Sequence, residues 1–208
     1  MFLGIDIGTS EVKAVLLDSS HNVVGSSGSV LTVNRPHPGH SEQNPHDWWT
    51  ATQTALGALR QAHPAQYAAV RAIGLSGQMH GAVLLDAQDR VLRPAILWND
   101  TRSSEECVQM MSELPELAQL GGSLAMPGFT APKLRWVARH EPEVFKQVAK
   151  VLLPKDYVRL MLTGDYVTDM SDASGTLWLD VQQRAWSDQL LALTGLNRAH
   201  MPRLVEGS

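Results

Sequence analysis

The first ten residues, MFLGIDIGTS, constrain the fold most strongly, because they place one charged side chain inside an otherwise apolar strand. Side chains of an extended strand alternate between two faces, so Ile5 and Ile7 share one face while Asp6 points to the other. Gly4 and Gly8 flank Asp6 on that second face and have no side chains to crowd it. The sequence therefore predicts an aspartate carboxylate in an open notch of a β-sheet.

A carboxylate in such a notch needs a partner, because burying it is costly without a cation, water or N–H groups. The turn formed by Gly8, Thr9 and Ser10 follows at once and offers hydroxyl groups and exposed amides. Phosphate with a divalent cation would satisfy this arrangement. The alternative is a plain β-hairpin in which Asp6 only caps the turn, since residues 12–18 (VKAVLLD) form a second predicted strand.

The hydrophobic pattern along the chain predicts an α/β protein. Residues 22–33 continue the hairpin as a third antiparallel strand. Asn44 is a predicted N-cap, and Pro45 opens a helix that runs to about residue 61. Residues 115–130 are predicted to be an irregular crossing near the cleft. Further strands are expected at 70–75, 82–86, 91–93, 95–98 and 150–153, and further helices at 103–114, 132–140, 142–148, 154–162 and 186–193.

Composition narrows the class of protein. With 208 residues and 44% hydrophobic residues, the chain can bury a substantial core in one large domain or two small ones. A net charge of −4 with scattered basic residues argues against binding to nucleic acid or to a membrane surface. We find neither an apolar run long enough to span a bilayer nor a leader sequence. Cys107 is the sole cysteine, which favours a reducing cytoplasm.

A second polar cluster follows the predicted strand at 70–75. The residues from Ser76 to Gly81 read SGQMHG, so polar groups stand between two glycines at the end of a strand. Ligand sites of α/β sheets favour such strand ends. Another polar stretch, from Asn99 to Arg102, follows the predicted strand at 95–98.

Three separated stretches resemble the same family. The segments GIDIGTS, GHSEQNPHDWW and GFTAPKLRWVARHEPE are similar to the N-terminal half of the FGGY family of carbohydrate kinases, which are actin-like, ribonuclease-H-like ATPases. The third segment fits the first signature of that family, with Lys133 and Trp136 three positions apart on a helix. The resemblance implies a ribonuclease-H-like α/β domain over residues 1–208, with a mixed central sheet and helices on both faces.

The resemblance also implies a substrate. Within the family, SGQMHG followed by PAILWNDTR is similar to xylulokinases, whereas glycerol kinases usually carry an Arg-Glu pair at the equivalent turn. A ketose needs neutral donors and acceptors to read its hydroxyl groups, around an apolar floor. The implied substrate-binding residues are Gln78, Met79, His80, Trp98, Asn99 and Asp100.

Other interpretations of these residues stay open. His80 could be a hydrogen-bonded histidine at a strand end, and Trp98 could belong to the core. Asp100 could form a structural ion pair with Arg102. Lys133 and Trp136 are expected to be a surface cation and a core aromatic.

The implied reaction is transfer of the ATP γ-phosphoryl group to a sugar hydroxyl. In the most similar enzymes this reaction converts D-xylulose to D-xylulose 5-phosphate. This chemistry depends on positioning and charge neutralisation. The resemblance implies that Asp6 acts on Mg²⁺ through its waters, and that Gly8, Thr9 and Ser10 form the first phosphate loop. Lys13 would add positive charge nearby.

The family's catalytic base and adenosine pocket belong to a second domain. The base is an Asp in a Gly-Asp motif at the start of that second domain, which this sequence is not expected to include, so we expect an N-terminal domain without its C-terminal partner and with little or no kinase activity alone. Without the second domain, the apolar surface that it would cover is exposed. This surface would favour association between copies of the chain, for example as a homodimer. None of the other carboxylates that we considered matches the base motif: Asp100, Asp156, Asp169 and Asp172.

Two other functions compete with this one. The chain could belong to a ribulose- or glycerol-type kinase of the same family, or it could be a non-catalytic sugar-binding module. A metal site is a further alternative, but its spacing is poor, and a loop bordering the sugar cleft explains the same residues better. The residues concerned are His37, His40, Glu42 and His46.

Overall fold

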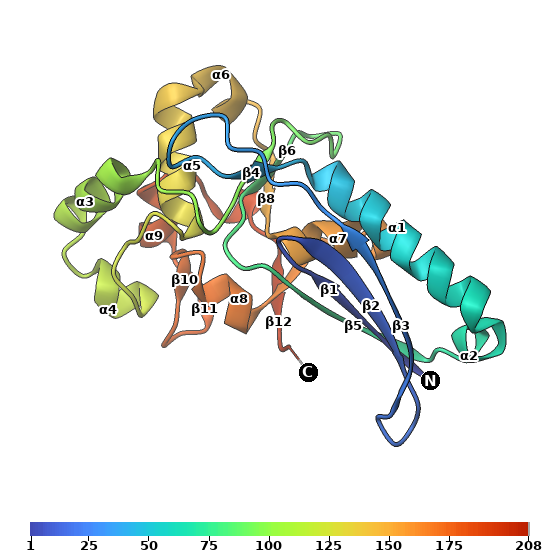
Figure 1. Ribbon diagram of the computed structural model, residues 1–208. Coiled ribbons are helices and arrows are strands. Elements are labelled where there is room, and N and C mark those ends of the chain that lie inside the picture. Colours follow the sequence, from blue (N-terminus) through green and yellow to red (C-terminus); the bar gives the residue numbers. More distant parts are fainter. Residues whose placement is uncertain (208) are drawn as a thin grey trace.

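The computed structural model describes residues 1–207, and Ser208, the last residue of the expected domain, lies outside the described residues. Its main sheet has the strand order β3-β2-β1-β5 (Figure 1). Strands β1, β2 and β3 are antiparallel neighbours, and β5 runs parallel to β1, so the mixed sheet expected from the sequence is confirmed. The strands are β1 (Phe2–Ile7), β2 (Glu11–Leu17), β3 (Val23–Val30) and β5 (Ala72–Gly77).

Two helices pack on one face of this sheet, α1 (Pro45–Ala62) and α7 (Pro154–Thr163). The side chain of Asn44 accepts a hydrogen bond from the His46 amide, which confirms the predicted N-cap. Ile5 and Ile7 face these helices and are buried. On the opposite face, Asp6 is exposed.

The remaining elements form a second region beside the main sheet (Figure 1). Its strands pair in twos: β4 with β7, β6 with β8, and β10 with β11 are antiparallel, while β9 and β12 are parallel. These strands are β4 (Glu42–Gln43), β6 (Val83–Leu85), β7 (Ala95–Ile96), β8 (Lys150–Leu152), β9 (Val167–Asp169), β10 (Leu179–Asp180), β11 (Ala185–Trp186) and β12 (Arg203–Val205). Its helices are α3 (Ser104–Glu113), α4 (Leu117–Gly121), α5 (Thr130–His140), α6 (Pro142–Phe145), α8 (Met170–Ser174), α9 (Asp188–Ala192) and the 3₁₀ helix η1 (Arg198–His200). The short helix α2 (Pro64–Ala68) instead follows α1 at the end of the main sheet (Figure 1).

The structure corrects several predictions in this region. The strand expected at 91–93 is reduced to an isolated bridge between Val91 and Leu85. The stretch 115–130, expected to be irregular, contains the short helix α4. The helix expected at 186–193 is shorter, because Trp186 belongs to β11 and the helix α9 spans Asp188–Ala192. The Ser187 side chain caps α9 by accepting a hydrogen bond from the Leu190 amide.

A short strand separates two hydrophobic cores. Leu84 of β6 lies in the core built around α3, α5 and α9, whereas Val83 and Leu85 lie in the core between the main sheet and α1. β8 divides in the same way, with Val151 on one side and Leu152 on the other. Strand periodicity thus makes β6 and β8 a wall shared by both cores.

No helix within residues 1–207 combines the length and apolar composition needed to cross a bilayer.

Candidate active site

The Asp6 carboxylate lies at an open hollow on the uncovered face of the main sheet. The hollow has a volume of about 380 Å³, and Asp6, Lys13 and Ser76 supply its polar lining. Ser76 donates a hydrogen bond from Oγ to Oδ1 of Asp6 at 2.6 Å. Lys13 stands directly opposite Asp6 in the antiparallel pair of β1 and β2. Asp6 is exposed, so the desolvation cost inferred from the sequence does not arise.

The turn between β1 and β2 is tied to two other segments through Thr9. The carbonyl oxygen of Thr9 accepts a hydrogen bond from Nε2 of Gln43 at 2.8 Å. Its hydroxyl donates to Oε1 of Gln78 at 3.1 Å and accepts from Nε1 of Trp98 at 3.1 Å. The predicted phosphate loop therefore contacts Gln78 of the SGQMHG segment and Trp98, which immediately precedes the polar stretch from Asn99 to Arg102.

Gln78 is buried, and internal contacts occupy its amide. Besides its contact with Thr9, its Nε2 donates to Oε1 of Gln43 at 2.8 Å, and the same oxygen accepts from Nε1 of Trp48 at 3.0 Å. The structure thus brings Gln78 to the loop of Thr9, and it does not line the pocket beside His80.

Met79 and His80 border a separate pocket of about 370 Å³, called here the His80 pocket. His80 adopts the left-handed backbone conformation, with φ of 66°. Its ring meets the ring of Phe129 edge to face at a centroid distance of 4.7 Å. The full lining consists of Met79, His80, Gly121, Gly122, Ser123, Phe129, Ser171, Asp172, Ser174, Gly175 and Val181.

The His80 imidazole is held in its neutral form. Burial, and then the positive charge of Lys133, lower the pKa of His80 to about 4. A neutral imidazole has one donor and one acceptor nitrogen, which suits the hydroxyl groups of a sugar. The SGQMHG motif indicates His80, whereas no local signal places Phe129 or Gly175 at this pocket, because both reach it from other elements. From the sequence, Asp172 is considered only as a base.

The stretch that follows β7 contributes less to a pocket than expected. Asp100 is 1% exposed, and its carboxylate accepts from Arg102 at 2.7 Å and from the Ser41 amide at 2.5 Å. The ion-pair alternative for Asp100 and Arg102 is therefore confirmed. Trp98 is 44% exposed, so the core alternative is wrong for it. Asn99 is half-buried beside it.

The two signature residues lie differently from the prediction. Lys133, expected at the surface, is completely buried. Trp136, expected in the core, is half-buried at the edge of the core, stacked on His140 at 4.5 Å and beneath the Arg102 guanidinium at 4.9 Å. Both differences arise because α5 packs against loops whose positions sequence periodicity does not encode.

The four residues considered as a metal site do not form one cluster, because they contact different partners. His37 meets His40 edge to face at 5.0 Å, while Glu42 pairs with Arg93 and Arg102. His46 lies 3.2 Å from the Tyr157 hydroxyl. Within residues 1–207, no group of three acidic, histidine or cysteine residues is arranged to hold a metal ion.

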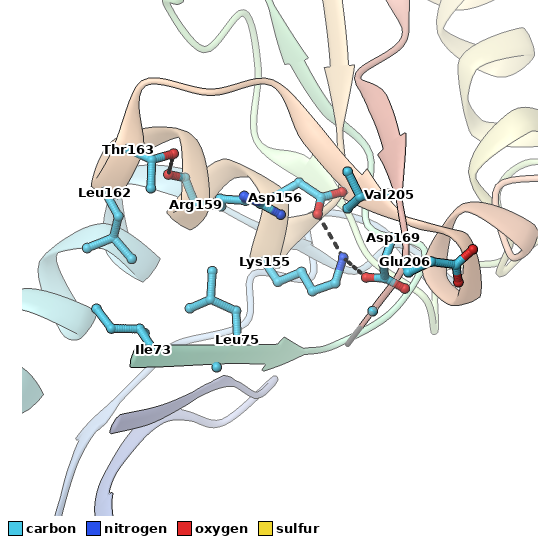
Figure 2. Close-up of a pocket in the computed structure, with 12 residues that line it drawn as sticks. Ile73, Leu75, Lys155, Asp156, Arg159, Leu162, Thr163, Asp169, Val205 and Glu206 are labelled. Atoms are coloured by element: carbon cyan, nitrogen blue, oxygen red, sulfur yellow. Dashed lines mark hydrogen bonds and ion pairs between the residues drawn. The ribbon is translucent and has the colours of Figure 1, made fainter. Parts of the chain in front are cut away.

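A third pocket, of about 350 Å³, lies between β5, α7 and the segment after β12 (Figure 2). Lys155 projects toward two of its acidic lining residues there, with contacts of 2.7 Å to Asp156 and 2.9 Å to Asp169. A third carboxylate, that of Asp172, lies 2.9 Å from the same ammonium. Burial opposes the charge of Lys155, but Asp156 and Asp172 outweigh it and raise its pKa.

These contacts decide what the third pocket can bind. The Lys155 ammonium is already shared by several carboxylates, so it offers no free charge to an anionic phosphate. Asp172 also lines the His80 pocket. We therefore infer that Lys155 holds the Asp172 side chain in place at the edge of the His80 pocket.

Comparisons with known proteins identify the family of this chain. The chain matches the FGGY family of carbohydrate kinases, N-terminal domain, over residues 1–208. It is 57% identical over 208 residues to the xylulose kinase of Escherichia coli (strain K12) and 56% identical to that of Klebsiella pneumoniae. In both cases it is covered completely and spans 43% of the relative.

A solved structure is similar over almost the whole chain. The crystal structure of a xyloylose kinase from Brucella ovis has a TM-score of 0.96 and 58% identity, covering 98% of this chain and 43% of that one. The similarity of sequence and of fold confirms the resemblance found in the three motif segments. The chain belongs to the FGGY family of carbohydrate kinases and matches the N-terminal domain of that family.

Proposed function

We propose that this chain is the sugar-binding half of a kinase that transfers the γ-phosphoryl group of ATP to a ketose. The ketose that we propose is D-xylulose. The observation that carries the proposal is the hydrogen bond between Thr9 and Gln78. It joins the turn after Asp6 directly to the segment that presents Met79 and His80. A phosphate loop and a sugar pocket must be adjacent for phosphoryl transfer, which depends on positioning. The names of the relatives support D-xylulose as the sugar.

The phosphate side of the proposal rests on the Asp6 hollow. Mg²⁺ prefers oxygen ligands, keeps several waters, and takes one or two carboxylates together with substrate phosphates. An exposed carboxylate that is hydrogen-bonded to the Ser76 hydroxyl, and is followed along the chain by the turn of Thr9 and Ser10, fits that donor set. When bound, Mg²⁺ would neutralise charge on the phosphates of ATP. Asp6 would orient its waters, Gly8 would leave room at the turn, and Lys13 would add positive charge.

The sugar side rests on the His80 pocket. Neutral His80 offers a donor and an acceptor to hydroxyl groups, and Met79, 44% exposed, offers an apolar surface to the carbon chain. Neither Trp98 nor Asn99 lines the His80 pocket, and Trp98 donates a hydrogen bond to Thr9, so any contact of these two residues with the sugar would come from the side of the Thr9 turn. Gln78 and Asp100 would act indirectly, because their polar atoms are engaged inside the protein.

The described residues supply no convincing catalytic base. Asp172 is the carboxylate that lines the His80 pocket in the described part of the chain, and it is paired with Lys155. A carboxylate held by an ammonium is better suited to accepting hydrogen bonds from hydroxyl groups than to removing a proton. We therefore propose that the base and the adenosine site come from outside this chain, and that the chain alone has little turnover.

The test is calorimetric titration of the 208-residue chain with D-xylulose, D-ribulose and glycerol, alongside an ADP-release assay with Mg²⁺-ATP and each sugar. We expect binding selective for D-xylulose, lost in His80→Ala, with no turnover. Preference for D-ribulose or glycerol would assign another kinase of the family. Robust turnover would show that a carboxylate within the chain acts as the base, and no sugar binding at all would overturn the proposal.

A further inference from the structure

Lys133 is a buried cation that the proposed function does not use. Its side chain is completely buried in the first turns of α5. Within residues 1–207, no carboxylate lies within ion-pair distance of its ammonium; instead Nζ donates to the carbonyl oxygens of His80 at 2.9 Å and Gly128 at 2.6 Å. A buried ammonium without a counter-ion is costly. In agreement, burial lowers the pKa of Lys133 to about 7.

The carbonyl of His80 is held by two donors from the same helix turn. Besides Lys133, the Thr130 hydroxyl donates to it at 3.2 Å. His80 has the positive φ that side-chain-bearing residues rarely adopt, so the surrounding contacts must maintain this conformation. Lys133 and Thr130 hold the carbonyl of this peptide group, and its N–H, that of Gly81, donates to the Met79 carbonyl oxygen at 2.8 Å.

The second acceptor of Lys133 links the opposite side of the pocket. Gly128 immediately precedes Phe129, whose ring packs against the His80 imidazole. One ammonium therefore joins the backbone that carries His80 to the backbone that carries Phe129. Lysine suits this task because its compact ammonium has three rotatable donors, whereas the guanidinium of arginine is larger and presents its donors in a fixed planar fork.

We propose that Lys133 is a positioning residue, which sets the orientation of the His80 imidazole by tying the His80 carbonyl to the Gly128 carbonyl. The consequence for sugar binding rests on the proposed function. The effect on the His80 ring is independent of it and can be measured without any sugar.

The experiment compares Lys133→Met with the matched control Lys146→Met in the 208-residue chain. Methionine fills the space of the lysine stem but donates no hydrogen bond. Lys146 is an exposed lysine paired with Glu143 on α6. We expect Lys133→Met to shift the ¹⁵N and ¹H signals of the His80 imidazole in the free protein and to raise the D-xylulose Kd at least about tenfold, on the scale of losing one or two hydrogen bonds. Lys146→Met should change neither.

A second variant covers the case in which Lys133→Met does not fold. Thr130→Val removes one donor to the His80 carbonyl and leaves Lys133 in place, so we expect the same direction of change with a smaller size. Unchanged imidazole signals in a folded Lys133→Met, or in Thr130→Val, would overturn the proposal. Shifted signals in a protein whose wild type binds no sugar would support the positioning role and overturn the proposed function instead.

Discussion

Gln78 donates a hydrogen bond from Nε2 to Oε1 of Gln43 at 2.8 Å, and this contact joins the end of β5 to the end of β4. The remaining amide groups of both side chains reach Thr9. Two neutral side chains therefore hold the turn after β1 in one position. Such a network is strong only while every member is satisfied.

Gln43→Leu should lower the free energy of unfolding by about 1–3 kcal/mol, because it leaves Nε1 of Trp48 without its acceptor and Nε2 of Gln78 with only a 3.5 Å contact to the Gly8 carbonyl oxygen. Urea unfolding followed by fluorescence measures this change. Thr54→Ala is the control, since it removes only an exposed hydroxyl contact within α1. Equal losses in the two variants would show that the network contributes nothing beyond an ordinary hydrogen bond.

Gly175→Ala should weaken D-xylulose binding by displacing the His80 ring. A Cβ at Gly175 would lie 2.3 Å from Cε1 of His80, and the φ of −73° means that alanine carries no backbone strain there. Gly57→Ala is the matched control, because a Cβ at that helical position meets nothing within 4 Å. We expect Gly57→Ala to bind normally and to gain about 0.5–1 kcal/mol of stability. Calorimetry on both variants decides, and equal affinities would contradict the placement of His80 in the sugar pocket.

The stability of the protein should depend on pH through His80. Its pKa is lowered to about 4 in the folded state by burial and then by Lys133, whereas a histidine in the unfolded chain titrates near about 6.5. Between these values the unfolded chain binds more protons, so the free energy of unfolding falls as the pH drops from about 6.5 towards 4.

His80→Asn should make that slope shallower, because asparagine does not titrate and tolerates a positive φ. Urea unfolding at several pH values in this window gives the slopes for both proteins. The carboxylates contribute equally to the two curves, so the difference belongs to His80. Parallel curves would show that the imidazole is protonated as easily in the folded protein as in the unfolded one.

Asp6→Ala should abolish turnover in a full-length kinase built on this domain, with little change in affinity for the sugar. If Asp6 orients Mg²⁺ and phosphate, we expect kcat to fall on the order of 100-fold or more while the KM for D-xylulose changes less than about threefold. Asp47→Ala, at an exposed aspartate in the first turn of α1, is the control. A comparable loss of kcat and of sugar affinity would contradict the phosphate assignment.

Local signals in the sequence were sufficient for much of the fold. The alternation around Ile5 and Ile7 predicted β1 and its buried face, and Asn44 with Pro45 predicted where α1 begins. The shortest paired strands, such as β9 and β12, were missed, because two or three residues carry no measurable period. The family resemblance, carried by motifs spread along the chain, supplied the fold class that local patterns alone left open.

The candidate site was predicted less completely. His80 and Met79 stand in a recognisable motif, and the structure places both at one pocket. The burial of Lys133 could not be read from its sequence, because a lysine on an amphipathic helix is usually a solvated side chain. Its partners are backbone carbonyls of His80 and Gly128, and backbone groups leave no trace in the identity of residues distant along the chain.

The shared wall formed by β6 and β8 bears on how the domain comes apart. Leu84 and its neighbours Val83 and Leu85 serve different cores on opposite sides of one short strand. Loosening one core removes the backing of the other, so neither can melt while the other stays folded. The His80 turn leads directly into this strand. The pocket therefore shares the cooperativity of the whole domain, and it should be lost in the same single transition.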